Sequence, residues 1–349
     1  MTADAVQAAR TLPGLLDALV ESAPEHEFLV YGSERWSYAA FRDETARLAA
    51  GLASLGIGRG DNVGLLMGNR AEWLTTMFAA LSLGARVVAV NTWFRARELR
   101  HVLAKADIAL LVAADRYLGQ DYLSLLREAE AFRKVETVVI LGETPPDALP
   151  FARLRGSPGA FPGPEPDDTA LILFTSGTTA MPKGAQLTHR GIVENMRAIG
   201  ERMRLEPQDR VWLAINLFWS FAAANALGAA LTHGATIVLQ HAFEPGEAMA
   251  LIERERCSVF YGLPNMAHAM WEHPDRPSRD LSSLRTGLSI GTPSEMALIE
   301  RLGVERILQV YGLTEAYGDS AGCDYDDPGE GRHTTCGRPL AGQELRLFG

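Results

Sequence analysis

Lysine is nearly absent from this chain. Of its 349 residues, 33 are lysine or arginine, and only Lys105, Lys134 and Lys183 are lysines. Lys183 lies in the stretch FTSGTTAMPKGAQLTH (174–189), among glycines and hydroxyl residues. A lysine in such a loop calls for a chemical reason, because arginine carries almost all the positive charge elsewhere.

Cysteine is also scarce. Cys257, Cys323 and Cys336 are widely spaced and form no CxxC pair. This spacing argues against a disulfide framework and a cysteine-based zinc site. It predicts a reducing compartment, and we expect a cytoplasmic protein.

Long apolar runs are missing. A membrane-spanning helix needs about 18 or more apolar residues, and the longest candidate, LFWSFAAANALGAAL (217–231), has the length of a buried helix instead. The N-terminus lacks a basic segment followed by an apolar core, so no signal peptide is predicted. We therefore expect no membrane partner.

The charge balance is acidic. The formal net charge is −10 and the calculated pI is about 5.4, with 47% hydrophobic and 22% charged residues. This is the composition of an ordinary globular protein, and its sign argues against nonspecific nucleic-acid binding. The most basic cluster, RARELRH (95–101), is interpreted as the solvated face of a helix.

Short aliphatic runs alternate with amphipathic segments along the chain. Buried runs separated by helices are typical of parallel strands covered on both faces, so we predict a doubly wound α/β fold, as one domain or as two stacked lobes. The Pro/Gly-rich segment 156–168 is interpreted as a surface connection, which divides the chain into a first lobe (1–160) and a second lobe (161–340). The predicted strands are NVGLLM (62–67), RVVAV (86–90), IALLVA (108–113), VETVVIL (135–141), ALILFT (170–175), ATIVLQ (235–240), CSVFYG (257–262) and ERILQVYG (305–312).

The loop around Lys183 has the chemistry of an anion site. ALILF (170–174) predicts a buried strand and 189–203 predicts a helix, so the loop follows the carboxyl end of a parallel strand, where open α/β sheets place ligands. Glycines let backbone N–H groups approach an anion, and lysine adds a mobile charge suited to phosphate. A P-loop is excluded, because G-x-x-x-x-G-K-S/T does not fit Pro182, Lys183 and Gly184. The alternative is a plain surface loop.

At this point three motifs resemble a known family. FTSGTTAMPKGAQLTH resembles the phosphate-loop pattern T-S-G-T-T-G-x-P-K-G of the adenylate-forming superfamily, which includes acyl-CoA synthetases, peptide-synthetase adenylation domains and luciferases. QVYGLTEA (309–316) resembles the family's Y-G-x-T-E element, and SIGTPSE (289–295) resembles its Gly-rich segment. The resemblance covers essentially the whole chain and implies the family's large N-terminal domain, with stacked parallel sheets flanked by helices.

The resemblance implies a role for individual residues. Lys183 and Thr314 would act on the phosphates, Glu315 would bind Mg²⁺, and Tyr311 would border the adenine. As single residues, Glu315 could be a solvated carboxylate and Tyr311 could simply pack. The implied phosphate-binding residues are Thr175, Ser176, Gly177, Thr178, Thr179 and Lys183, and the implied adenine or AMP residues are Gly291, Thr292, Pro293, Tyr311, Gly312 and Thr314.

The implied reaction is the attack of a substrate carboxylate on the α-phosphorus of ATP, followed in CoA ligases by thioester formation with CoA. The acid itself is left open. Two departures concern the site: Ala180 stands where the family usually has glycine, and Trp219 stands where many relatives have histidine. The small residues that follow Trp219 fit a roomy pocket and close helix packing equally well. The residues expected to select the acid are Trp219, Phe221, Asn225, Tyr261 and Gly291.

The ending GQELRLFG (342–349) has the alternation of a strand that is just beginning. The family's small C-terminal lid domain would follow, so we expect a fragment of a protein of roughly 500 residues, inactive alone if that domain is needed. Three functions stay open. Two differ in the acceptor of the acyl group, which is CoA in one and a carrier protein or an amine in the other. The third is a non-catalytic adenylate-binding lobe that works with a partner. The oligomeric state is also open.

Overall fold

The computed structural model describes residues 2–175 and 181–346. The chain forms two compact units, each described by itself. The first comprises Met1–Glu25, Tyr38–Gly191 and Leu217–Trp219, and the second comprises His26–Ser37, Ile192–Asn216 and Ser220–Gly349.

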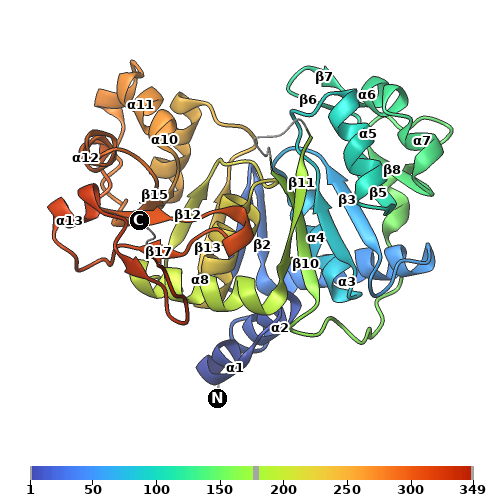
Figure 1. Cartoon of the computed structure of the whole chain (residues 1–349), viewed down its shortest axis with the longest axis horizontal. Helices are drawn as coiled ribbons and strands as arrows, with labels where there is room; N and C mark the ends of the chain where they lie inside the picture. The colour runs from blue at the N-terminus through green and yellow to red at the C-terminus, as the bar shows by residue number, and fades with distance from the viewer. Residues whose placement is uncertain (1, 176–180, 347–349) are drawn as a thin grey trace. The chain divides into compact units, whose positions relative to one another are not determined.

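The first unit is built on a seven-stranded sheet with the order β11-β10-β4-β3-β5-β8-β9 (Figure 1). Its strands pair in parallel except β10 with β11. Every residue of β3 is buried, as expected for a strand covered on both faces. The strands are β3 (Asn62–Leu66), β4 (Arg86–Ala89), β5 (Ile108–Ala114), β8 (Thr137–Leu141), β9 (Leu149–Pro150), β10 (Thr169–Thr175) and β11 (Lys183–Thr188), with a separate hairpin of β6 (Arg116–Tyr117) and β7 (Gln120–Asp121).

Helices cover this sheet. Ten of the twelve residues of α4 are buried, and Trp73 is fully enclosed. In Figure 1, α5, α6 and α7 gather beside β5 and β8. The helices of the first unit are α1 (Thr2–Ala8), α2 (Leu12–Ser22), α3 (Tyr38–Ser54), α4 (Ala71–Ser82), α5 (Ala96–Lys105), α6 (Tyr122–Glu128), α7 (Ala131–Lys134) and the 3₁₀ helix η1 (Phe151–Leu154).

The second unit contains a nine-stranded sheet with the order β18-β17-β16-β15-β14-β12-β13-β1-β2. The pairs from β16 to β1 are parallel, and the sheet ends in antiparallel strands at both edges. The strands are β1 (Glu27–Tyr31), β2 (Glu34–Ser37), β12 (Arg210–Leu213), β13 (Thr236–Leu239), β14 (Val259–Tyr261), β15 (Thr286–Ser289), β16 (Arg306–Tyr311), β17 (Ala321–Gly322) and β18 (Arg338–Pro339).

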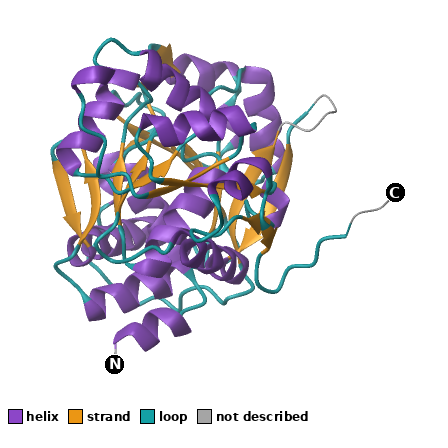
Figure 2. Cartoon of the chain, turned by 90° about the vertical axis from the view of Figure 1, so that its left-hand side faces the viewer, coloured by secondary structure: helices purple, strands orange, loops and turns teal. Residues whose placement is uncertain are grey.

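A core of buried side chains joins α10, α11 and α12 to one face of this sheet, around Trp212 and Phe260. The rings of these two residues stack with centroids 5.2 Å apart. Figure 2 shows helices lying beside the strands. The helices are α8 (His189–Met203), which begins in the first unit, the π-helix η2 (Phe221–Ala226), α9 (Leu227–His233), α10 (Pro245–Glu255), α11 (Pro264–Glu272), η3 (Arg276–Ser278), α12 (Pro293–Leu302), η4 (Thr314–Ala316) and α13 (Gly329–Thr334).

The predicted α/β fold with parallel sheets flanked by helices is confirmed. The helix predicted over 189–203 is α8, and the buried helix predicted within 217–231 is η2 followed by α9. No helix among the described residues is long and apolar enough to cross a membrane.

Two local predictions are wrong. The segment between β10 and α8 is not one loop, because Lys183–Thr188 forms the antiparallel strand β11. Its alternating burial explains the strand, since Ala185 and Leu187 are buried while Gly184 and Gln186 are exposed. The strand expected from GQELRLFG (342–349) does not form over residues 342–346, and residues 347–349 lie outside the described part of the chain.

Candidate active site

The predicted phosphate-binding residues that the structure describes lie on the β10–β11 hairpin of the first unit. Thr175 is the last residue of β10 and pairs with Lys183, the first residue of β11. Lys183 is exposed and Thr175 is half-buried. Nε2 of His101 lies 3.1 Å from the carbonyl oxygen of Pro182, so helix α5 helps to position the start of β11. Ser176, Gly177, Thr178 and Thr179 lie outside the described residues.

In the second unit, the loop after β16 carries the YGLTE motif at the carboxyl end of a parallel strand. Its backbone folds back on itself: the N–H of Gly318 donates to the carbonyl of Leu313, and the N–H of Ser320 donates to that of Tyr311. A Cβ at position 312 would lie 1.8 Å from the carbonyl oxygen of Gly318. Position 312 therefore accepts only glycine in this conformation.

The turn η4 places two functional candidates at the tip of this loop. The hydroxyl oxygens of Thr314 and Ser220 lie 3.1 Å apart, which links the loop to the residue preceding the π-helix. The neighbouring Glu315 is exposed, as is Tyr311, at 51%. The Thr314 hydroxyl is thus held by Ser220, whereas the carboxylate of the next residue, Glu315, is open to solvent.

The segment 289–295 forms the start of helix α12. Thr292 is the N-cap and Pro293 is the first helical residue, an arrangement common at helix starts. The Glu295 carboxylate accepts hydrogen bonds from the backbone N–H and the hydroxyl of Thr292, both at 2.7 Å. These bonds hold the pKa of Glu295 below its usual value. Helix capping accounts for this residue pattern, and the adenine role of Gly291, Thr292 and Pro293 stays a prediction.

Three of the predicted acyl-selecting residues lie together in the second unit. The rings of Phe221 and Tyr261 have centroids 5.0 Å apart. The Tyr261 hydroxyl donates to Oδ1 of Asn225, and Nδ2 of Asn225 donates to the carboxylate of Asp319. Tyr261, Asn225 and Asp319 are all fully buried. Residues 221–226 form a π-helix, a rare element that is frequently found at functional sites.

Burial dominates the electrostatics of this cluster. It raises the pKa of the Asp319 carboxyl to about 7, although the hydrogen bond from Asn225 opposes the shift. It also raises the pKa of Tyr261 well above the ordinary value, and the nearby Asp319 adds to that shift. Tyr261 therefore stays a neutral donor, while Asp319 changes its charge near neutral pH.

Trp219, the fourth residue predicted to select the acid, belongs to the first unit. It packs edge-to-face against Trp93, with ring centroids 5.2 Å apart, and against Phe218 at 5.7 Å. The segment is anchored by Asn69, whose Oδ1 accepts a hydrogen bond from the backbone N–H of Leu217 at 2.9 Å. Trp93 is 56% exposed, so this aromatic group presents a large apolar ring to solvent.

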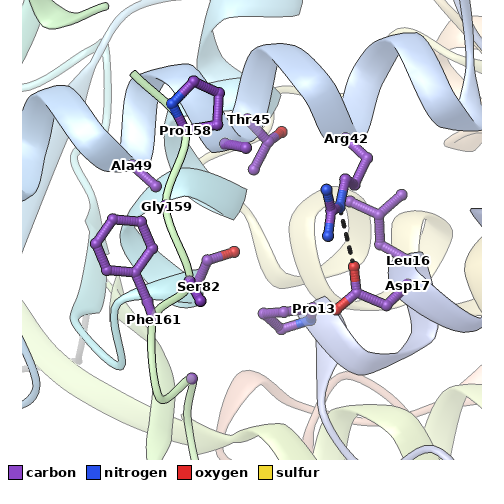
Figure 3. Close-up of a pocket in the computed structure, with 13 residues that line it drawn as sticks. Pro13, Leu16, Asp17, Arg42, Thr45, Ala49, Ser82, Pro158, Gly159 and Phe161 are labelled. Atoms are coloured by element: carbon purple, nitrogen blue, oxygen red, sulfur yellow. Dashed lines mark hydrogen bonds and ion pairs between the residues drawn. The ribbon is translucent and has the colours of Figure 1, made fainter. Parts of the chain in front are cut away.

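The first unit also contains a cavity of ≈ 540 Å³ that no predicted site residue lines (Figure 3). Pro158 and Phe161, from the Pro/Gly-rich segment, form part of its wall, and the ion pair between Arg42 and Asp17 closes another part at 3.3 Å. This cavity is separate from the residues that carry the motif chemistry.

The structure thus groups the predicted residues by unit: Thr175, Lys183 and Trp219 in the first, and the remaining described ones in the second. Within the second unit it brings Thr314 next to Ser220, and Tyr261 and Asn225 next to Asp319. Sequence reasoning missed Ser220, Asp319, Trp93 and His101. No sequence signal pointed to Asp319, since it lies outside the YGLTE pattern and its partner Asn225 is 94 residues away.

The chain belongs to the AMP-binding enzyme family, whose pattern matches residues 16–349. It is 34% identical over 354 residues to a methyl-dioxo-octahydroindenyl-propanoyl:CoA ligase of Mycobacterium tuberculosis, an alignment that covers 97% of this chain and 69% of that protein. It is 31% identical to the acyl-CoA ligase sidI of Aspergillus fumigatus, covering 93% of this chain and 59% of the relative.

Solved structures agree on the fold. An anthranilate CoA ligase, AuaEII, in complex with anthranoyl-AMP superimposes with a TM-score of 0.87 at 24% identity, over 100% of this chain and 68% of that one. MbtA of Mycobacterium smegmatis superimposes with a TM-score of 0.84 at 28% identity, over 100% and 67%. The resemblance inferred from the three motifs is confirmed: the chain is of the acyl-CoA synthetase type, an acid–thiol ligase.

Proposed function

We propose that this chain binds ATP with Mg²⁺ and a carboxylic acid, forms the acyl-adenylate, and serves acyl transfer to CoA. The observation that carries this proposal is the closed loop after β16, which puts Thr314 and Glu315 side by side at the carboxyl end of a parallel strand. Such strand ends are where open α/β sheets bind ligands. That the ligand is an adenine nucleotide is inferred from membership of the AMP-binding enzyme family.

In this reaction the protein contributes mainly by positioning the reactants and stabilising charge. A carboxylate oxygen of the acid attacks the α-phosphorus, and the bond from that phosphorus to the bridging oxygen of pyrophosphate breaks. In the second step the CoA sulfur attacks the acyl carbonyl carbon, and AMP leaves. Lys183 and Thr175 would hold the β- and γ-phosphates, and Thr314 would contact the α-phosphate, its hydroxyl held by Ser220.

The residues present fit a magnesium ion. Mg²⁺ commonly takes one or two carboxylates together with substrate phosphates and water, and exposed Glu315 offers one carboxylate next to Thr314. Among the described residues no group of three or more histidine, cysteine or acidic side chains could hold a metal by itself. When bound, the ion would neutralise charge on the phosphates. The role of Glu315 is to hold it.

We place this reaction in the cytoplasm. The support is chemical: Cys257, Cys323 and Cys336 are free thiols in the structure, a state that a reducing compartment maintains.

The proposal is tested by thermal shifts with stable acyl-adenylate mimics, the 5′-O-(N-acylsulfamoyl)adenosines, that carry aliphatic, alicyclic and aromatic acyl groups. A ligand at 100 times its Kd adds about 2.7 kcal/mol to the free energy of unfolding, which corresponds to roughly 2–4 °C for a chain of this size. A shift that depends on the acyl class supports the proposal and identifies the acid. Shifts no larger than those given by adenosine alone contradict it.

A further inference from the structure

Two hydrogen-bonded links join the segments 220–225 and 314–319 in the second unit. At one end the hydroxyls of Ser220 and Thr314 lie 3.1 Å apart. At the other end Nδ2 of Asn225 donates to Oδ2 of Asp319. The links are five residues apart on both segments, and residues 221–226 form the π-helix, whose i→i+5 bonding matches that spacing. The Thr314 end carries the proposed α-phosphate contact, and the Asp319 end lies five residues further along both segments.

The amide of Asn225 has a fixed orientation. Its Oδ1 accepts from the hydroxyl of Tyr261, a group that burial keeps protonated, so its Nδ2 faces Asp319. All three side chains are 0% exposed. Burial raises the pKa of Asp319 to about 7, so above neutral pH this group is an ionised carboxylate that accepts hydrogen bonds only. In that state the direction of donation runs from Tyr261 through Asn225 to Asp319.

One oxygen of Asp319 is left over. Its Oδ1 is buried and has no hydrogen-bond partner within the described part of the chain. The main chain at this position is held firmly, because the Asp319 carbonyl accepts from the side chains of Asn195 at 2.7 Å and Gln343 at 3.2 Å. A buried carboxylate oxygen without a donor is costly. The neighbouring π-helix contributes small side chains, Ala222, Ala223 and Ala224.

Resting on the proposed function, we propose that Asp319 is a specificity-determining residue of the acyl subsite, and that its Oδ1 accepts a hydrogen bond from a hydroxyl or amino group on the substrate acid. The acid is thus a hydroxy- or amino-substituted carboxylic acid. Because Asp319 is 0% exposed, a substrate group has to move a neighbouring side chain to reach it. Phe221, which packs against the ring of Tyr261, is the half-buried member of this cluster. Discrimination of this kind is strong, because an acid without the donor leaves the buried carboxyl unsatisfied.

The experiment compares acylsulfamoyl-adenosines in matched pairs, a hydroxyl- or amino-bearing acyl group against the same group with hydrogen or methyl, by calorimetric titration. Above neutral pH, the wild-type chain binds the donor-bearing member of at least one pair about tenfold more tightly or better, a difference of at least about 1.4 kcal/mol, since hydrogen bonds to charged groups are among the stronger ones. Equal affinity within every pair overturns the inference while the proposed function stands. Absence of binding by all mimics, with AMP also unbound, refutes the proposed function instead.

Asp319→Asn gives a readout that a structural role would not produce. Because Asn225 presents a donor, the new amide turns its oxygen toward Asn225 and its NH₂ toward the ligand. The preference then reverses, from donor-bearing mimics to matched mimics with an acceptor such as a ketone. Asp326→Asn, on the surface of the same unit, is the control and keeps the wild-type preference. If Asp319→Asn does not fold, Tyr261→Phe frees the Asn225 amide to rotate and weakens the preference; an unchanged preference in the folded variant overturns the inference.

Discussion

Thr175 and Lys183 pair across two antiparallel strands, as the last residue of β10 and the first of β11. Seven residues separate them in the sequence, yet the hairpin fixes both ends of that segment at one edge of the first unit's sheet. Lys183 is exposed there, so its charge is available to a ligand. The rare lysine thus has a defined place, and its role in holding phosphate is directly testable.

Replacing Lys183 with alanine should weaken the binding of ATP with Mg²⁺ by about 10- to 100-fold, because a charge-assisted contact to phosphate contributes about 1.5–3 kcal/mol. The fold should be unaffected, since the side chain is exposed. Calorimetric titration measures the change. Lys105→Ala, at the exposed end of helix α5, is the matched control. If both variants bind ATP with equal affinity, Lys183 does not hold phosphate.

Gly312→Ala should open the loop that carries Thr314 and Glu315. The added Cβ meets the Gly318 carbonyl oxygen at 1.8 Å, and relief of such overpacking costs about 1–3 kcal/mol. We expect a lower Tm and loss of nucleotide affinity. In Gly331→Ala, the control, the new Cβ has no neighbour within 4 Å, so the Tm should stay the same or rise. Normal nucleotide binding by Gly312→Ala would show that this loop conformation is dispensable.

Glu315→Gln keeps the size of the side chain and removes its charge. If Glu315 holds Mg²⁺ beside the phosphates, the gain in ATP affinity on adding Mg²⁺ should fall by about tenfold or more, whereas ATP binding in EDTA should change little. Titrations with and without Mg²⁺ supply both numbers. Glu330→Gln, on the exposed side of α13, controls for net charge. A full Mg²⁺ effect in Glu315→Gln would rule out the metal role.

His189 should make the chain sensitive to acid. Burial lowers its pKa from 6.5 to about 4, and its Nδ1 accepts the backbone N–H of Leu12 at 3.3 Å. Between these two values the unfolded chain binds a proton that the folded chain does not, so the free energy of unfolding falls as the pH falls from 6.5 to 4. The loss is on the order of 3 kcal/mol at 1.36 kcal/mol per pKa unit.

The measurement for His189 is the denaturation midpoint of wild type and His189→Gln at several pH values. The difference between the two proteins is the relevant quantity, because Asp319 and other carboxyls titrate over the same range. We expect wild type to lose stability relative to the variant on acidification. The denaturation midpoint of His268→Gln, at an exposed position of α11, should change with pH as that of wild type does. If the midpoint of His189→Gln also follows that of wild type across the pH range, the prediction is contradicted.

The core of the fold was predictable because its signal is local and periodic. Runs such as NVGLLM and IALLVA are continuous and apolar, and the strands they form, β3 and β5, are buried on both faces. Strands β2 and β11 gave weaker signals. Both lie at sheet edges and carry exposed polar residues, so the segment Lys183–Thr188 has the composition of a loop in the sequence.

The residues of the candidate site were predictable only where they belong to a recognisable motif. Lys183, Thr314 and Glu315 stand in short patterns that can be recognised without a structure. Asp319 and Trp93 stand in no such pattern, because their significance depends on partners 94 and 126 residues away, Asn225 and Trp219. Which lone aspartate is buried, and with a spare oxygen, is a property of packing that spacing in the sequence does not encode.

The central claim is that one site binds an acyl group and an adenylate together. Calorimetric titration of the wild-type chain with the best acylsulfamoyl-adenosine, with AMP and with the free acid tests it most directly. A mimic of a bound intermediate should bind at least about 100-fold more tightly than AMP, and a bound mimic should exclude both ATP and the acid. A mimic that binds no more tightly than AMP, or that leaves ATP binding unchanged, would contradict the account.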